Sequence, residues 1–169
     1  MKTIAALFFG YALLLPTVQA QPGKWKDEFV KHLTTSKAFT LDVANAMPAE
    51  SYDFKPNPEE MSYGELMVHI AQSQSNAFAR ATGGKSPLAK PAVLDKATVV
   101  KYLTDAFDYC LKSLGDMEAD GAEKMSGPEG KQMSARETMW AYFTHTAHHR
   151  GQAEVYLRVK GIKPPAYRF

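Results

Sequence analysis

The stretch from residue 134 to residue 161 reads SARETMWAYFTHTAHHRGQAEVYLRVKG and predicts the last helix of the fold. It opens with Ser134, and Glu137 follows three residues later, which is the capping-box pattern of a helix N-terminus. Gly161 is placed to end the helix, and the pair Pro164-Pro165 prevents its continuation. No strand alternation or hairpin signal competes with this interpretation, here or elsewhere in the sequence.

Three further helices are predicted upstream, each with apolar side chains three or four residues apart. The first covers about 24–46. The second opens at a capping box over 62–65 and runs to Gly83-Gly84, and the third covers about 96–117. Cys110 is the single cysteine and falls on the apolar stripe of the third helix, so a buried thiol is expected rather than a nucleophile. Four amphipathic helices in one domain predict an all-α four-helix bundle.

The N-terminus has the features of an export signal. Lys2 supplies a positive charge, residues 4–15 are almost entirely apolar, and residues 18–20 form a small-x-small cleavage site ending at Ala20. The apolar run is shorter than the roughly 20 residues that a transmembrane helix needs. We therefore expect a cleaved signal peptide over 1–20 and a periplasmic or secreted bundle over 21–169, with no membrane attachment after cleavage. An uncleaved N-terminal anchor is the alternative.

The charge balance argues against a nucleic-acid partner. The chain has 20 Lys and Arg residues against 18 Asp and Glu residues, and it has no basic run interleaved with aromatic side chains. A small molecule is the expected partner.

Three histidines lie within five positions of the last predicted helix. An α-helix turns by about 100° per residue, so His145 and His149 lie about 40° apart around the axis and about 6 Å apart along it. They can therefore direct their imidazoles at one point, and two histidines at this spacing are a recurrent metal-binding pair. His148 points about 100° away from His149 and cannot easily join the pair.

His69 is the candidate for a third ligand. It follows Ser62 by seven residues and His145 follows Ser134 by eleven, so each lies close to a whole number of turns from its helix cap. The two faces can meet inside a bundle. Three neutral imidazoles suit one divalent transition metal, with zinc or nickel expected first and iron or copper as alternatives. A plain bundle with structural histidines and no metal is the competing interpretation.

Other metal chemistries fit the sequence less well. The zincin pattern needs Glu directly after the first histidine, where this chain has Thr146. The Glu-x-x-His pairs of di-metal bundles and the CxxCH motif of covalent haem are both missing from the sequence. A three-histidine site with open coordination positions is what remains.

No catalytic acid or base can be assigned from the sequence, although several polar residues are candidates for roles around the metal. Gln72 and Gln152 each follow a proposed ligand by three residues, and a solvent-facing position is an equally good interpretation for both. Glu154 and Glu50 could act as bases but are more typical of surface charges. The remaining candidates for the pocket or the surroundings of the ligands are Arg150, Tyr63 and His148.

The run His145-Thr-Ala-His-His-Arg-Gly-Gln152, with the segments 155–158 and 161–165 after it, resembles the last helix of the DinB-like (DinB/YfiT) bundle proteins. The segment 47–62, which includes Met47-Pro-Ala-Glu50, and the run Leu66-Met-Val-His-Ile-Ala71 resemble the family's first connection and second helix. The likeness covers nearly all of the mature chain and is most specific in the His-His-Arg-Gly-Gln run.

The resemblance implies a four-helix bundle with three histidine ligands that match His69, His145 and His149. It also implies a homodimer, and relatives that are transferases or isomerases dependent on a small cellular thiol. The predicted export signal departs from that cytosolic chemistry.

Two functions follow as expectations. One is a metal-dependent hydrolase or transferase acting on a small molecule. The alternative is a non-catalytic, metal-stabilised binding module of the periplasm.

Overall fold

Four long helices make up most of the chain, as the sequence predicted. The computed structural model describes residues 24–118 and 120–169, so the predicted signal peptide lies outside the described residues. The helices are α1 (Lys24–Ala46), α2 (Tyr63–Ala81), α3 (Lys96–Gly115) and α4 (Ala135–Val159). The third helix ends two residues earlier than the predicted end at Met117, which is only partly buried.

The connections contain short elements that the sequence analysis did not predict. Two single-turn 3₁₀ helices, η1 (Ala49–Ser51) and η2 (Gly121–Glu123), lie in the first and third connections. The strands β1 (Met125–Ser126) and β2 (Met133–Ser134) form an antiparallel pair, so the expectation of no strand or hairpin was wrong. Two residues per strand are too few to produce a readable alternation of apolar and polar side chains.

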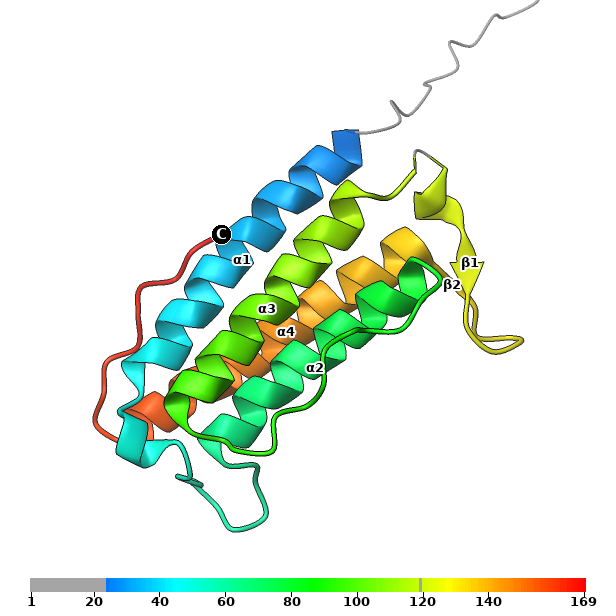
Figure 1. Cartoon of the computed structure of the whole chain (residues 1–169). Coiled ribbons are helices and arrows are strands. Elements are labelled where there is room, and N and C mark those ends of the chain that lie inside the picture. Colours follow the sequence, from blue (N-terminus) through cyan, green and yellow to red (C-terminus); the bar gives the residue numbers. More distant parts are fainter. Residues whose placement is uncertain (1–23, 119) are drawn as a thin grey trace, which may run out of the picture.

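The order of the helices in space differs from a simple up-and-down bundle. α2 packs against α3 and α4, and α1 packs against the same two helices. The connection over 82–95 runs back along the bundle, so α2 and α3 begin at the same end (Figure 1). This return brings Leu94 against Gly64, where an added Cβ would lie 3.1 Å from the Leu94 carbonyl oxygen and 3.2 Å from that of Tyr52. A glycine is therefore needed at the start of α2.

Caps fix the ends of the two helices that carry the predicted ligands. At α2 the capping box is complete: the Glu65 N–H donates to Ser62 Oγ (3.2 Å), and the Ser62 N–H donates to Glu65 Oε2 (2.7 Å). At α4 only the first half of the predicted box is found, because the Ser134 hydroxyl accepts from the Glu137 N–H at 3.1 Å without the reciprocal bond. Gly161 ends α4 with φ +73°, the left-handed conformation typical of a helix stop.

The apolar stripes of the four helices meet in one core. Fully buried residues come from every helix, for example Phe29, Ile70, Leu103 and Leu157. Cys110 is fully buried as predicted, and burial raises the pKa of its thiol, so it is not a reactive nucleophile.

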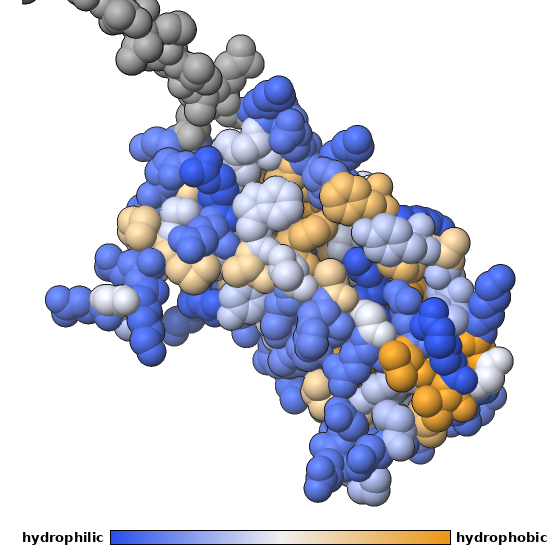
Figure 2. Space-filling model, turned by 180° about the vertical axis from the view of Figure 1, so that it is seen from behind, coloured by the Kyte–Doolittle hydropathy of each residue, from blue (hydrophilic) through white to orange (hydrophobic). Residues whose placement is uncertain are grey.

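The outer surface is mainly hydrophilic, with one apolar area on the face turned away in Figure 1 (Figure 2). On α4, Val155 and Val159 are one turn apart and are 54 and 58 % exposed. None of the described helices combines the length and the apolar character that crossing a membrane requires.

Candidate metal centre

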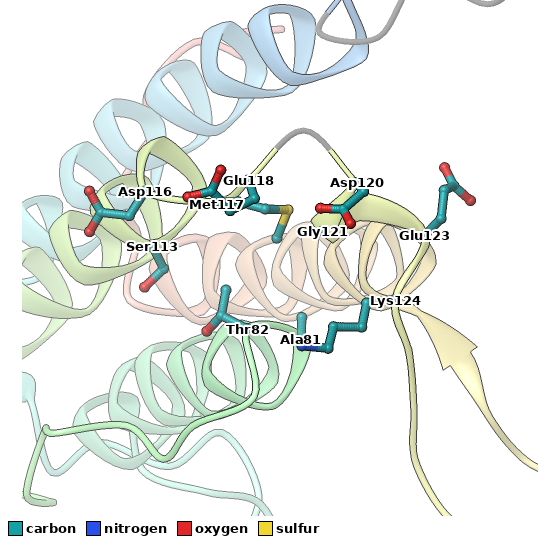
Figure 3. Close-up of a pocket in the computed structure, with 10 residues that line it drawn as sticks. All are labelled: Ala81, Thr82, Ser113, Asp116, Met117, Glu118, Asp120, Gly121, Glu123 and Lys124. Carbon is teal, nitrogen blue, oxygen red and sulfur yellow. The ribbon is translucent and has the colours of Figure 1, made fainter.

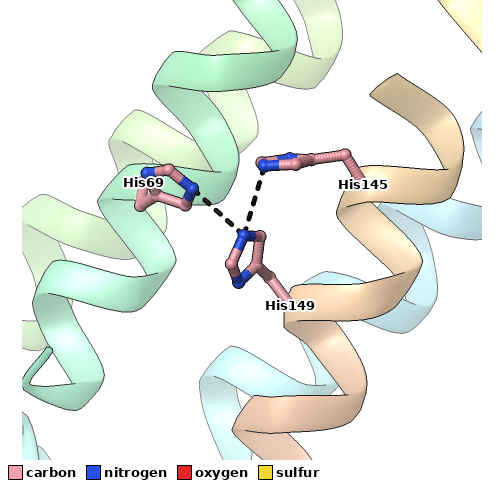
Figure 4. Close-up of side chains that lie close together, drawn as sticks. All are labelled: His69, His145 and His149. Atoms are coloured by element: carbon pink, nitrogen blue, oxygen red, sulfur yellow. Dashed lines mark hydrogen bonds between the residues drawn. The ribbon is translucent and has the colours of Figure 1, made fainter. Parts of the chain in front are cut away.

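Three imidazoles from two packed helices converge on one point. His149 Nε2 lies 3.1 Å from His69 Nε2 and 3.2 Å from His145 Nε2, and the three nitrogens all lie within 4.8 Å of one another. His69 comes from α2 and the other two come from α4, and the rings face one another across the gap between the helices (Figure 4). The three histidines that the sequence singled out are therefore brought together.

A buried hydrogen bond holds α2 and α4 in register beside the cluster. Thr146 follows His145 directly, and its hydroxyl donates to Gln74 Oε1 at 2.6 Å. Both side chains are almost completely buried. The sequence analysis assigned no role to Gln74, because a single polar residue on an apolar helix face carries no sign of its partner.

The orientation of His149 is set by a chain of two hydrogen bonds. Its Nδ1 lies 3.0 Å from Gln152 Oε1, and Gln152 Nε2 donates to Glu60 Oε2 at 3.0 Å. The amide oxygen can only accept, so Nδ1 carries a proton and Nε2 of the neutral ring presents its lone pair to the cluster. Gln152 therefore contacts the cluster through His149, while Glu60, in the connection before α2, was not identified from the sequence.

We expect Gln152→Leu to weaken metal binding by about 10–100-fold, because the mutation removes the acceptor that fixes the His149 ring. The measurement is a titration with zinc against a competing chelator. Gln72→Leu is the matched control: Gln72 also follows a histidine of the cluster by three residues, but its side chain makes no hydrogen bond to the cluster among the described residues. Equal affinities for the two variants would contradict this role.

Partial burial favours the neutral form of two of the three imidazoles. Desolvation lowers the pKa of His69 and of His145, and the neighbouring His149 lowers both further. A neutral imidazole has a free lone pair, which is the form that binds metal.

The fit to a metal ion can be tested on the nitrogen positions. Two nitrogen ligands about 2.1 Å from one ion, at angles of 90–109°, lie about 3.0–3.4 Å apart. The observed spacings of 3.1 and 3.2 Å fall in this range. Hydrogen bonds alone cannot satisfy the cluster, because His149 Nε2 has one lone pair and two histidine neighbours. His145 Nδ1, in addition, is buried and has no hydrogen-bond partner among the described residues. The three residues fit a shared metal ion.

The other predicted site residues lie away from the cluster's centre. His148 is exposed on α4, where its ring packs edge-on against that of His149 with centroids 4.9 Å apart but is not one of the converging imidazoles, and Glu50 is exposed in η1. Tyr63 is buried, and its hydroxyl donates to the Val43 carbonyl at 2.6 Å, so it fastens α2 to α1 instead of lining the pocket. Arg150 and Glu154 face a different cavity between α1 and α4.

A cavity of about 480 Å³ adjoins the cluster. His69 and Gln72 line it from α2, and the connection over 90–94 forms the opposite wall. Glu65 and Lys90 contribute one charge of each sign to its lining. One histidine of the cluster, His69, thus borders this space.

Another cavity, of about 650 Å³, lies where α2 ends, beside the end of α3 and η2 (Figure 3). Its lining includes four acidic side chains, whose carboxylates point in different directions in the close-up. Within the described ranges, the group of side chains close enough to share a metal ion is the histidine cluster, and these acidic side chains are not part of such a group.

The comparison with known families agrees with this geometry. The sequence model of the DinB superfamily matches residues 32–153, a span that includes all three histidines. The chain belongs to the DinB superfamily. This confirms the family resemblance noted in the sequence.

Relatives in the DinB superfamily share the fold. The uncharacterized protein YjoA of Bacillus subtilis (strain 168) is 25 % identical over 140 residues, which cover 80 % of this chain and 90 % of YjoA. The crystal structure of that DinB-like protein has a TM-score of 0.70 at 20 % identity and covers 83 % of this chain and 96 % of its own. A DinB-like protein from Bacillus cereus ATCC 10987 has a TM-score of 0.74 at 18 % identity, covering 84 and 97 %.

Proposed function

We propose that this protein is an exported metalloenzyme that uses His69, His145 and His149 to hold one divalent transition metal for hydrolysis or group transfer on a small molecule. The observation that carries the proposal is the convergence of three Nε2 atoms beside a cavity of about 480 Å³. Export rests on the sequence alone, on the apolar run over 4–15 and the cleavage site at Ala20.

The chain's own residues have separable tasks in this proposal. The three imidazoles present lone pairs, and Gln152 fixes the ring of His149 through Nδ1. Gln72 and Lys90 line the cavity where the substrate would lie and offer polar contacts to it. A divalent ion held by the histidines supplies Lewis-acid chemistry and lowers the pKa of a water molecule to near 7.

A non-catalytic, metal-stabilised binding module is the second candidate. The observation that favours it concerns the catalytic base. Among the described residues, Glu60 is the one carboxylate that hydrogen bonds connect to the cluster, and this connection passes through Gln152. Glu65 also lines the cavity, but its carboxylate accepts a hydrogen bond from the Ser62 N–H at the start of α2 and is committed to the helix cap.

The two candidates are separated by a turnover screen of the zinc- or nickel-loaded protein on simple esters, amides, lactones and thiol-transfer substrates. We expect metal-dependent turnover in the wild type and in His148→Ala, and its loss in His69→Ala, because His148 is exposed outside the cluster. Turnover that persists in His69→Ala would contradict the proposed site. A metal-loaded wild type with no turnover on any of these substrates would favour the binding module.

A further inference from the structure

A separate cavity of about 370 Å³ lies between α1 and α4. Ala147, Gly151 and Glu154 line it from α4, and at about 100° per residue they point away from the face that carries His145 and His149. The cavity is therefore independent of the metal centre. Its volume is in the range of about 300–1,000 Å³ that small-molecule sites occupy.

The last residues of the chain cover this cavity with aromatic rings. The segment after α4 runs alongside α1 (Figure 1). Tyr167 packs edge-on against Phe39 with ring centroids 5.8 Å apart, and Phe169 packs against His32 at 4.6 Å. Arg168, between them, forms an ion pair with Asp42 on α1. Tyr167 and Phe169 are 74 and 76 % exposed, so a flat apolar ligand would stack against these rings at the mouth of the cavity.

The floor of the cavity contains a buried charge without a counter-charge in contact. Arg150 lines the cavity and is only 6 % exposed. Its Nη1 donates to Ser36 Oγ (2.9 Å) and to Thr40 Oγ1 (3.2 Å), and its guanidinium lies 4.6 Å from the centre of the Phe39 ring. Over residues 24–118 and 120–169, no ion pair includes Arg150.

This arrangement leaves the guanidinium incompletely satisfied. It has five N–H donors in a planar fork, and the hydrogen bonds found in the described chain come from Nη1 alone. Within the described residues the guanidinium contacts two neutral hydroxyls and a ring; burial lowers the pKa of Arg150, and the charge of Glu154 in the same lining offsets only part of this desolvation cost. An anion bound through the free part of the fork would remove that cost.

We propose that this cavity is a binding site for a small aromatic monocarboxylate, with the carboxylate on Arg150 and the ring between the aromatic side chains that cover it. The carboxylate matches the guanidinium fork in a bidentate pair. The nearby Glu154, 3.7 Å from Arg158, adds a negative charge to the lining. A single negative charge on the ligand is therefore favoured over two.

The test uses benzoate as the probe and benzamide as its neutral counterpart, measured by calorimetry on the full protein. Metal is removed beforehand with a chelator so that the carboxylate cannot bind at the histidine cluster. We expect benzoate to bind with a Kd on the order of 1 mM, as suits a fragment of this size. Benzamide should bind at least about tenfold more weakly because it lacks the charge. Equal binding of the two probes, or no heat with benzoate up to about 20 mM, would overturn the proposal.

Variants then locate the site. Arg150→Lys keeps the charge but loses the fork, so benzoate affinity should fall at least about tenfold. Ala147→Leu fills the cavity without touching Arg150 and should abolish binding, which keeps the proposal testable if the Arg150 variant fails to fold. Glu154→Gln removes the repelling charge and should tighten binding severalfold, while His148→Ala should bind as the wild type does. Wild-type affinity in Ala147→Leu, or weaker binding in Glu154→Gln, would refute the site.

Discussion

Replacing His149 with alanine is expected to reduce bound metal from about one ion per chain to none under conditions that saturate the wild type. His149 is the central member of the cluster, because its Nε2 lies within 3.2 Å of both other Nε2 atoms. The two remaining histidines come from different helices and keep no third nitrogen to complete the site. We expect an affinity loss of more than about 100-fold, since even a residue that only supports a ligand costs about 10–100-fold. Elemental analysis of protein purified without a histidine tag measures the effect.

His148→Ala is the matched control for that experiment. It removes an imidazole one position away on the same helix, and that imidazole is exposed and outside the cluster. We expect the control to keep its metal. If both variants lose the metal, the effect belongs to the helix and not to the ligand. If His149→Ala keeps it, the cluster is a structural group of histidines and the proposed chemistry has no centre.

The helices and the members of the histidine cluster could be predicted from the sequence because both depend on local spacing. The four predicted helices agree with the structure to within about two residues at most ends. The spacing of His145 and His149 places both on one face of α4 by the geometry of the helix alone. His69 needed a second argument, its distance from the cap at Ser62, and the complete capping box in the structure supports that argument.

The surroundings of the cluster could not be predicted, because they depend on which helices become neighbours. Gln74 on α2 meets Thr146 on α4, and the two residues are 72 positions apart in the sequence. Glu60 lies in a connection whose path has no periodic pattern, yet it holds Gln152. Tyr63, the first residue of α2, was a candidate for the pocket, but its hydroxyl donates to the Val43 carbonyl on α1.

The two-residue strands and the half-formed cap of α4 also could not be predicted from the sequence. Both depend on the path of the third connection, where Met133–Ser134 pairs with Met125–Ser126 directly before the helix begins. The capping-box pattern at Ser134 identified the start of α4 correctly. The reciprocal bond between the Ser134 N–H and the Glu137 side chain is not found. Its absence could not be predicted, because a local sequence pattern carries no information on what the preceding residues pair with.

Metal binding should also raise the melting temperature by about 8–16 °C. The cluster joins α2 to α4, so an ion that holds all three histidines binds the folded chain much better than the unfolded one. At a free metal concentration about 1,000 times the Kd, that preference stabilises the fold by about 4 kcal/mol. For a domain of this size, each kcal/mol raises the melting temperature by about 2–4 °C. Thermal unfolding followed by circular dichroism, with zinc and with a chelator, measures the difference.

The comparison of variants decides where this stabilisation comes from. In His149→Ala the zinc and chelator curves should coincide, because the site that distinguishes folded from unfolded chain is gone. Gln152→Leu should show an intermediate shift at limiting zinc and approach the wild-type shift at higher zinc, since it weakens the site without removing a ligand. A full shift that persists in His149→Ala would place the stabilising metal elsewhere on the chain. Coinciding curves in the wild type would mean that the three imidazoles hold α2 and α4 together without an ion.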